Sequence, residues 1–265
     1  MTFIMILTRI FFYYFIICIL LYFIQGKLIF FPQPLSAAQY ESYKELEVSF
    51  QREDDISLHG WFLKGQGEGA KKLIIYFGGN AEEVSGSFAE FRDNLDSSLL
   101  VINYRGFGKS KGSPSQEALF ADGLFIYDEI KKKHGFSEEN IILFGRSLGS
   151  GVATFVASKR KVGKVILVTP FDSVLNIARK KYFIFPVKLL LNHPFPSVVF
   201  AANIAYPLLE IVATEDEVIP NAHSKSLFEA WKGEKKYIEI EGANHQNVSN
   251  FRNYWTEIRD FISSQ

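Results

Sequence analysis

A serine lies in the pattern Gly-x-Ser-x-Gly at residues 145–149 (GRSLG), between an apolar stretch that predicts a strand and a segment that predicts a helix. On such a sharp turn the serine backbone is strained, and the positions two before and two after it need small residues. Both are glycine. The amino terminus of the following helix would favour negative charge on a reacting oxygen. The alternative is a glycine-rich helix start without a chemical role. We predict that Ser147 is a nucleophile.

A serine hydroxyl needs a neighbouring base, which an acid in turn orients. After a strand-to-helix serine turn these partners follow in the order serine, acid, histidine. Among the five histidines, His245 lies in the loop after the last predicted strand, 237–240, where the base is required. The other four lie in a predicted hairpin, at helix ends or in a proline-flanked segment: His59, His134, His193 and His223. We predict His245 as the base.

Two aspartates compete for the role of the acid. Asp216 lies in the segment ATEDEVIP, directly after a predicted strand at 208–212. Asp172 lies in TPFDS, after the preceding predicted strand at 165–168, where an acid can also be mounted. The position of its loop relative to the sheet favours Asp216.

Stabilising the oxyanion of a tetrahedral intermediate requires two backbone N–H donors. Leu148, the residue after the serine, supplies one, and we expect Asn80 in the Gly78-Gly79-Asn80 turn to supply the other. Glycines there let the backbone approach a substrate closely, although the turn could use them only for its own conformation. Neither a metal-ligating cluster nor a complete phosphate-binding loop is present in the sequence, so we expect no cofactor and no metal.

Short apolar segments alternate with amphipathic ones along most of the chain. The predicted strands at 72–77, 99–103, 141–144, 165–168, 208–212 and 237–240 are separated by predicted helices, among them 116–133, 148–158, 222–231 and 248–262. Two earlier segments with period-two apolar positions, 45–50 and 56–63, predict an antiparallel hairpin. This order predicts an α/β fold with a mostly parallel sheet covered by helices on both faces.

The amino-terminal segment predicts a membrane helix. Phe3 to Ile24 contains Arg9 as its only charge and would span roughly 33 Å as a helix. A cleaved signal peptide is the alternative, but bulky residues close the apolar run where small ones would be needed. We therefore expect an uncleaved anchor at 1–26, an extended linker at 27–44 that contains Pro32 and Pro34, and one domain at 45–265. The flanking charges slightly favour a non-cytoplasmic domain.

The composition excludes several classes of protein. Lys and Arg number 29, equal to Asp and Glu, so the zero net charge argues against nucleic-acid binding. The hydrophobic fraction of 48% excludes a disordered chain. The single cysteine, Cys18, excludes an internal disulfide and a thiolate metal site.

Five segments in order resemble the α/β-hydrolase superfamily, and within it the small membrane-anchored hydrolases often grouped with serine aminopeptidase-like proteins. They are YFGGNAEE (76–83), NYRGFGKSKGSPS (103–115), ILFGRSLGSGVA (142–153), ATEDEVIP (213–220) and EGANHQN (241–247). The resemblance runs from about Leu28 to the C-terminus and implies an eight-stranded sheet, with Ser147, Asp216 and His245 as catalytic triad and Asn80 at the oxyanion position. The chain departs from the family pattern at Gly78, where the family commonly has histidine, and at Ala213, where it usually has glycine.

An insertion at about 171–206 separates two predicted core strands and is rich in apolar residues. It either forms a lid over the site or packs on the sheet. Together with the membrane helix it favours an apolar, lipid-like acyl ester or thioester as the substrate. A serine peptidase, and a non-catalytic protein of the same fold that binds a partner at the membrane, are the alternative interpretations.

Overall fold

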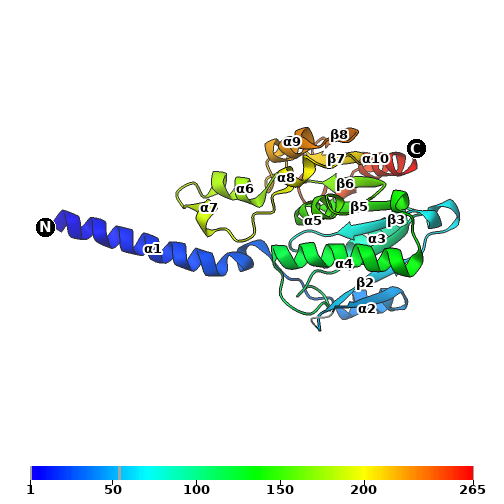
Figure 1. Ribbon diagram of the computed structural model, residues 1–265, viewed down its shortest axis with the longest axis horizontal. Helices are drawn as coiled ribbons and strands as arrows, with labels where there is room; N and C mark the ends of the chain where they lie inside the picture. Colours follow the sequence, from blue (N-terminus) through cyan, green and yellow to red (C-terminus); the bar gives the residue numbers. More distant parts are fainter. Residues whose placement is uncertain (1, 53–54, 265) are drawn as a thin grey trace.

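The computed structural model describes residues 2–52 and 55–264 and contains an eight-stranded sheet (Figure 1). Its spatial order is β1-β2-β4-β3-β5-β6-β7-β8. β2 pairs antiparallel with β1 and β4, and every other pairing in the sheet is parallel. The strands are β1 (Glu47–Gln51), β2 (Ser57–Leu63), β3 (Leu73–Phe77), β4 (Ser98–Ile102), β5 (Ile141–Arg146), β6 (Lys164–Val168), β7 (Leu208–Ala213) and β8 (Lys235–Ile240).

Helices pack on both faces of this sheet. One face carries the core that involves α4 (Gln116–His134), α5 (Leu148–Ala157), α8 (Ser197–Ala201) and α9 (Asn221–Ala230). The other carries α3 (Ser85–Asn94) and α10 (Arg252–Ser263). Short 3-10 helices are η1 (Lys44–Leu46), η2 (Gly67–Lys71), η3 (Glu138–Asn140) and η4 (Val248–Asn250).

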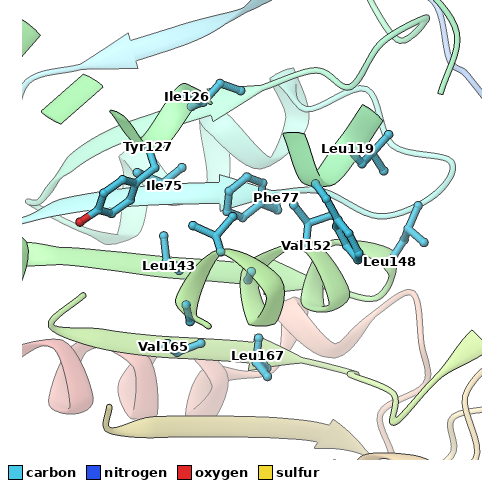
Figure 2. Packing of buried hydrophobic residues seen from close by; sticks show 14 of the residues in the cluster. Ile75, Phe77, Leu119, Ile126, Tyr127, Leu143, Leu148, Val152, Val165 and Leu167 are labelled. Carbon is cyan, nitrogen blue, oxygen red and sulfur yellow. The ribbon is translucent and has the colours of Figure 1, made fainter. Parts of the chain in front are cut away.

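The central strands are buried on both sides, which explains their continuous apolar sequences. In β3, Ile75 and Phe77 belong to the core on the α4–α5 side, whereas Ile74 and Tyr76 belong to the core on the α3–α10 side. Figure 2 shows the first of these cores, where strand residues such as Phe77 meet Val152 of α5. The predicted α/β class and the opening hairpin are confirmed.

Two helices differ from the sequence-based expectation. α2 (Ala37–Tyr43) lies inside the segment predicted to be an extended linker, so that prediction is wrong for these residues. The reason is a capping box, in which Ser36 and Gln39 satisfy each other's backbone N–H groups and start a helix just past Pro34. α3 was not expected, and it is held by the burial of Phe88 and Phe91.

The amino-terminal helix α1 (Thr2–Ile29) extends three residues beyond the predicted anchor. Within the described part of the chain, Phe3–Ile29 is the helix that is long and apolar enough to cross a membrane, and most of its surface is unburied. Figure 1 shows it projecting from the domain. Length and composition are therefore compatible with a single membrane span.

The insertion predicted at 171–206 packs on the sheet in part, and its role as a lid stays a prediction. It contains α6 (Val174–Lys181), α7 (Val187–Leu190) and α8. Phe195, Ala201 and Ile204 are buried in the core on the α4–α5 side. By contrast, residues 182–184 expose their apolar side chains, although Val174 and Ile177 of α6 still pack against this core.

Candidate active site

Ser147 occupies a sharp turn between β5 and α5. Its backbone has φ 51° and ψ −119°, an uncommon conformation for a residue with a side chain. The flanking glycines make this turn possible. A Cβ at Gly145 would lie 2.5 Å from the Gly149 carbonyl oxygen, and one at Gly149 would lie 1.9 Å from that of Phe77. The turn thus presents Ser147 at the carboxyl edge of the sheet.

The loops after β7 and β8 bring an acid and a histidine to this serine. Ser147 Oγ lies 3.0 Å from His245 Nε2, and His245 Nδ1 lies 2.7 Å from Asp216 Oδ2. His245 lies 98 residues after Ser147 and 29 residues after Asp216 in the sequence. All three side chains are nearly buried: Ser147 is 7% exposed and the Asp216 side chain 2%. These distances allow a proton to pass from Ser147 to His245 while Asp216 fixes the imidazole.

The backbone holds Asp216 in its orientation. Its Oδ1 accepts hydrogen bonds from the N–H groups of Val218 and Ile219, each at 2.8 Å, which leaves Oδ2 for the histidine. The competing Asp172 does not reach His245. Its Oδ1 lies 2.9 Å from His223 Nδ1, and its carboxylate accepts hydrogen bonds from the Ser173 N–H and from Asn176 Nδ2. Asp172 therefore stabilises the start of α6.

The two expected oxyanion donors lie on either side of Ser147. Leu148 begins α5, and the turn that contains Asn80 runs past the serine, since a Cβ at Gly79 would lie 3.8 Å from Ser147 Cβ. Within residues 2–52 and 55–264, neither the Leu148 nor the Asn80 N–H donates to another protein group. Both groups are available to an incoming oxygen.

The end of α1 fastens the Asn80 turn. The Phe31 N–H donates to the Asn80 carbonyl oxygen at 2.9 Å, and Asn80 Nδ2 donates to the Ile29 carbonyl oxygen at 3.1 Å. Sequence reasoning missed this connection, because no local pattern at 29–31 indicates a partner 50 residues away.

A partly buried carboxylate, Glu82, supports the same turn from the other side. Glu82 Oε2 accepts the Gly79 N–H at 2.7 Å and lies 3.3 Å from Arg146 Nη1. Arg146 Nη2 in turn donates to the His245 carbonyl oxygen at 3.1 Å. Glu82 and Arg146 thus join the Asn80 turn, the serine turn and the histidine loop. Both lie within motifs singled out in the sequence, but their partners depend on the folded arrangement.

Two hydroxyl groups complete the environment of Glu82. Its Oε1 accepts hydrogen bonds from Tyr76 at 2.8 Å and from Ser87. Burial, followed by the nearby Glu82 charge, raises the pKa of Tyr76 well above its usual value, so Tyr76 stays a donor throughout the neutral range.

Position 78 is glycine in this chain, where the family pattern commonly has histidine, and the reason is steric. A Cβ at Gly78 would lie 2.9 Å from Val84 Cγ1 and 3.2 Å from Glu82 Cδ. The histidine common at this position would collide with both side chains. The Gly78 carbonyl oxygen instead accepts a hydrogen bond from Tyr104 Oη at 2.9 Å.

Comparisons with known proteins show which proteins the chain is similar to. No model of a known protein family matches it. The human alpha/beta hydrolase domain-containing protein 17C is 29% identical over 227 residues, which cover 83% of this chain and 67% of the human protein. An uncharacterised protein of Mycobacterium tuberculosis is 28% identical over 227 residues, covering 84% of this chain and 81% of that protein.

Solved structures share the fold at lower identity. An esterase from Pyrococcus furiosus is 17% identical with a TM-score of 0.69, and the match covers 88% of this chain and 96% of that chain. The mouse alpha/beta hydrolase domain-containing protein 10 is 18% identical with a TM-score of 0.62, covering 82% and 98%. The sheet order, the serine turn after β5 and these similarities show that the chain has the α/β-hydrolase fold and are consistent with a member of that superfamily.

Proposed function

We propose that the chain is a membrane-anchored serine hydrolase that cleaves carboxylic esters or thioesters with an apolar acyl group. The observation that carries the proposal is the contact series from Ser147 Oγ through the His245 ring to Asp216, at 3.0 and 2.7 Å. A serine in a strained turn, a histidine in hydrogen-bond reach and an acid behind it form the arrangement that activates a hydroxyl group.

In the acylation step, Ser147 Oγ attacks the substrate carbonyl carbon while His245 Nε2 takes the hydroxyl proton. The negative charge that develops on the carbonyl oxygen is stabilised by the N–H groups of Leu148 and Asn80. Asp216 holds the proton-bearing Nδ1 of His245 and stabilises the imidazolium that forms. His245 then protonates the leaving alcohol or thiol, which leaves an acyl-enzyme on Ser147.

In the deacylation step, water replaces the leaving group. His245 takes a proton from this water, and the resulting hydroxide attacks the acyl carbon. The second tetrahedral intermediate uses the same two N–H donors. Its collapse releases the carboxylic acid and returns the proton to Ser147.

Two observations support this substrate class: the first favours an ester, and the second favours an apolar acyl group. The structural neighbours include an esterase from Pyrococcus furiosus and an acetyl xylan esterase from Paenibacillus, the latter 17% identical with a TM-score of 0.65 over 82% of each chain. In this chain, the turn carrying Asn80 is bonded to the end of the apolar helix α1. If α1 is the membrane anchor, the site lies close to the bilayer, where acyl chains are concentrated.

The test is hydrolysis of p-nitrophenyl esters and acyl thioesters of increasing chain length by the full chain in detergent. We expect kcat/KM to rise from acetyl to medium-length chains, and Ser147→Ala to abolish hydrolysis of every ester. Ser158→Ala, a serine at the far end of α5, is the matched control. Equal hydrolysis by wild type and Ser147→Ala would overturn the proposal.

A further inference from the structure

The first half of the insertion forms an arm beside the amino-terminal helix. We call residues 174–191, which include α6 and α7, the α6–α7 arm. Figure 1 shows it extending from the domain on the same side as α1, and contacts between α1 and α7 place the two side by side. The arm begins just after Asp172 and Ser173, in the loop that follows β6, and the last residue of β6, Val168, accepts the hydrogen bond of the Ser147 N–H.

Specific contacts hold the arm against α1. Tyr14 Oη donates to the Ile184 carbonyl oxygen at 2.8 Å, and the Tyr14 ring stacks on Phe185. Further along, Gln25 donates to the Leu190 carbonyl oxygen at 2.8 Å and accepts the Asn192 N–H at 2.6 Å. These contacts follow α1 for eleven residues, or about 16 Å.

The contacts cover one face of α1. Tyr14 and Leu21 are partly buried, and Cys18 and Gln25 are buried, at the spacing of a single helical face. The remaining surface of the helix exposes apolar side chains along its length. The arm therefore belongs to the same apolar surface as α1.

The tip of the arm is itself apolar and uncovered. Phe183 and Leu189 are 81% and 80% exposed, and Ile184 is 61% exposed. Exposed apolar side chains of this size, gathered on one projecting segment, indicate a surface that another apolar phase covers. The tip contacts Tyr14, near the middle of α1. If α1 crosses a hydrocarbon layer of about 30 Å, a group held on Tyr14 lies inside that layer.

The positive charge on the arm favours binding to a membrane surface that contains anionic lipids. The arm has no acidic residue, and its basic residues are all exposed: Arg179, Lys180, Lys181 and Lys188. Long basic side chains bury their alkyl stems and extend their charge to the headgroup phosphates. An anionic leaflet attracts such residues electrostatically.

We propose that the α6–α7 arm is a second membrane contact, inserted into the leaflet next to the domain. Phe183, Ile184 and Leu189 enter the hydrocarbon, and the basic residues bind anionic headgroups. The inference rests on the anchoring role proposed for α1. The arm follows the end of β6, whose last residue, Val168, accepts the Ser147 N–H. It therefore gives acyl chains a path from the bilayer to the site, and the substrate class becomes lipid-borne esters.

The test measures insertion directly in the full-length chain. A fluorescent NBD group is attached to a single cysteine at Phe183→Cys or Leu189→Cys in a Cys18→Ala background. Phe12→Cys on α1 is the anchor reference, and Glu68→Cys, before β3, is the aqueous control, since its side chain is 88% exposed. The proteins are placed in vesicles of phosphatidylcholine and phosphatidylglycerol that contain lipids with doxyl quenchers on their acyl chains.

We expect quenching at 183, 189 and 12 but not at 68. Quenching at 12 alone would overturn the inserted arm while leaving the anchor intact. Absence of quenching at all four positions would overturn both the arm and the anchor. Thermal unfolding of each labelled variant shows that it is folded.

A second measurement links the arm to the substrate. Phe183→Ser/Leu189→Ser is compared with Val199→Ser, an exposed apolar residue outside the arm. We expect the ratio of the rate on a vesicle-borne ester to the rate on a dissolved ester to fall at least fivefold in the double variant only. An unchanged ratio would overturn the path from the bilayer. If wild type hydrolyses neither ester, the hydrolase proposal fails, whereas the quenching result still decides the position of the arm.

Discussion

The Asn80 side chain donates a hydrogen bond to the carbonyl oxygen of Ile29 at 3.1 Å, so a residue expected to stabilise the oxyanion is fastened to the last residue of α1. The neighbouring Phe31 N–H adds a second bond, to the Asn80 carbonyl oxygen. The end of the amino-terminal helix is thus hydrogen-bonded to the turn that carries Asn80. Residues 29 and 31 are bonded directly to the hydrolase domain.

Two truncations test this continuity. A chain starting at Lys27 keeps both bonds to Asn80, whereas one starting at Pro34 loses both. We expect the shorter protein to have kcat/KM at least tenfold lower on a dissolved ester, equivalent to about 1.4 kcal/mol. The reason is that the Asn80 turn loses its two hydrogen bonds to residues 29 and 31. Its Tm should fall as well, since the buried Phe30 is removed. Equal kcat/KM for the two proteins would refute the role of residues 28–31.

Glu82→Gln tests whether the Glu82 carboxylate positions the Asn80 turn. Glutamine cannot accept hydrogen bonds on both of its terminal atoms, so either the Gly79 N–H or the Tyr76 hydroxyl loses its acceptor. We expect kcat to fall about tenfold with KM nearly unchanged, because the turn matters most in the transition state. The control is Glu83→Gln, whose carboxylate contacts Ser85 and Asn103. A change in KM alone for Glu82→Gln would argue against a positioning role.

Asp216→Asn and Asp172→Asn separate the two candidate acids. Asparagine at 216 keeps the shape of the side chain but favours the wrong histidine tautomer, so kcat should fall by about 10³–10⁴-fold. Asparagine at 172 disturbs the contact with His223 and should lower Tm with kcat within a few fold of wild type. Steady-state kinetics and thermal unfolding of both variants check this. The opposite ranking in kcat would exchange the two roles.

Glu210 predicts a dependence of stability on pH. It is fully buried in β7, and within the described residues neither carboxyl oxygen has a hydrogen-bond partner. Burial, opposed only partly by Lys235, raises its pKa well above the usual value. The folded chain must therefore keep a proton that the unfolded chain releases above about pH 4.3, so stability falls as pH rises from there toward the raised pKa.

Glu210→Gln removes this titration. We expect the variant to be more stable than wild type at pH 7.5 by at least about 1 kcal/mol, or roughly 2–4 °C in Tm, with the gain shrinking toward pH 5. Thermal unfolding between pH 5 and 8 measures it, with the exposed Glu239→Gln as the control. A gain that does not vary with pH would show that Glu210 does not titrate in this way.

The sheet could be predicted because its strands are buried on both faces and appear as uninterrupted apolar runs. β3, for example, was expected at 72–77 and lies at Leu73–Phe77. α3 was missed because its first three residues are Ser85, Gly86 and Ser87, which do not favour a helix. Its signal was the spacing of Phe88 and Phe91. α2 was hidden by two prolines, although Ser36 and Gln39 carried a capping signal.

The residues expected at the site could be proposed from the order of motifs along the chain. Their order relates each residue to the end of a particular strand, and parallel strands end at one edge of the sheet. The supporting contacts could not be derived in this way. The bonds from Glu82 to Gly79, and from Arg146 to the His245 carbonyl, join loops that are distant in sequence, and their partners are set by the packing of the whole sheet.

The central claim is that Ser147 is an activated nucleophile, and covalent labelling tests it most directly. The full chain in membranes is treated with a fluorophosphonate, and the modified peptide is identified by mass spectrometry. We predict a single adduct on Ser147, which disappears in Ser147→Ala, is strongly slowed in His245→Ala, and persists in the control Ser158→Ala. A folded wild-type protein that forms no adduct, or one that labels equally with Ser147 replaced, would contradict the account.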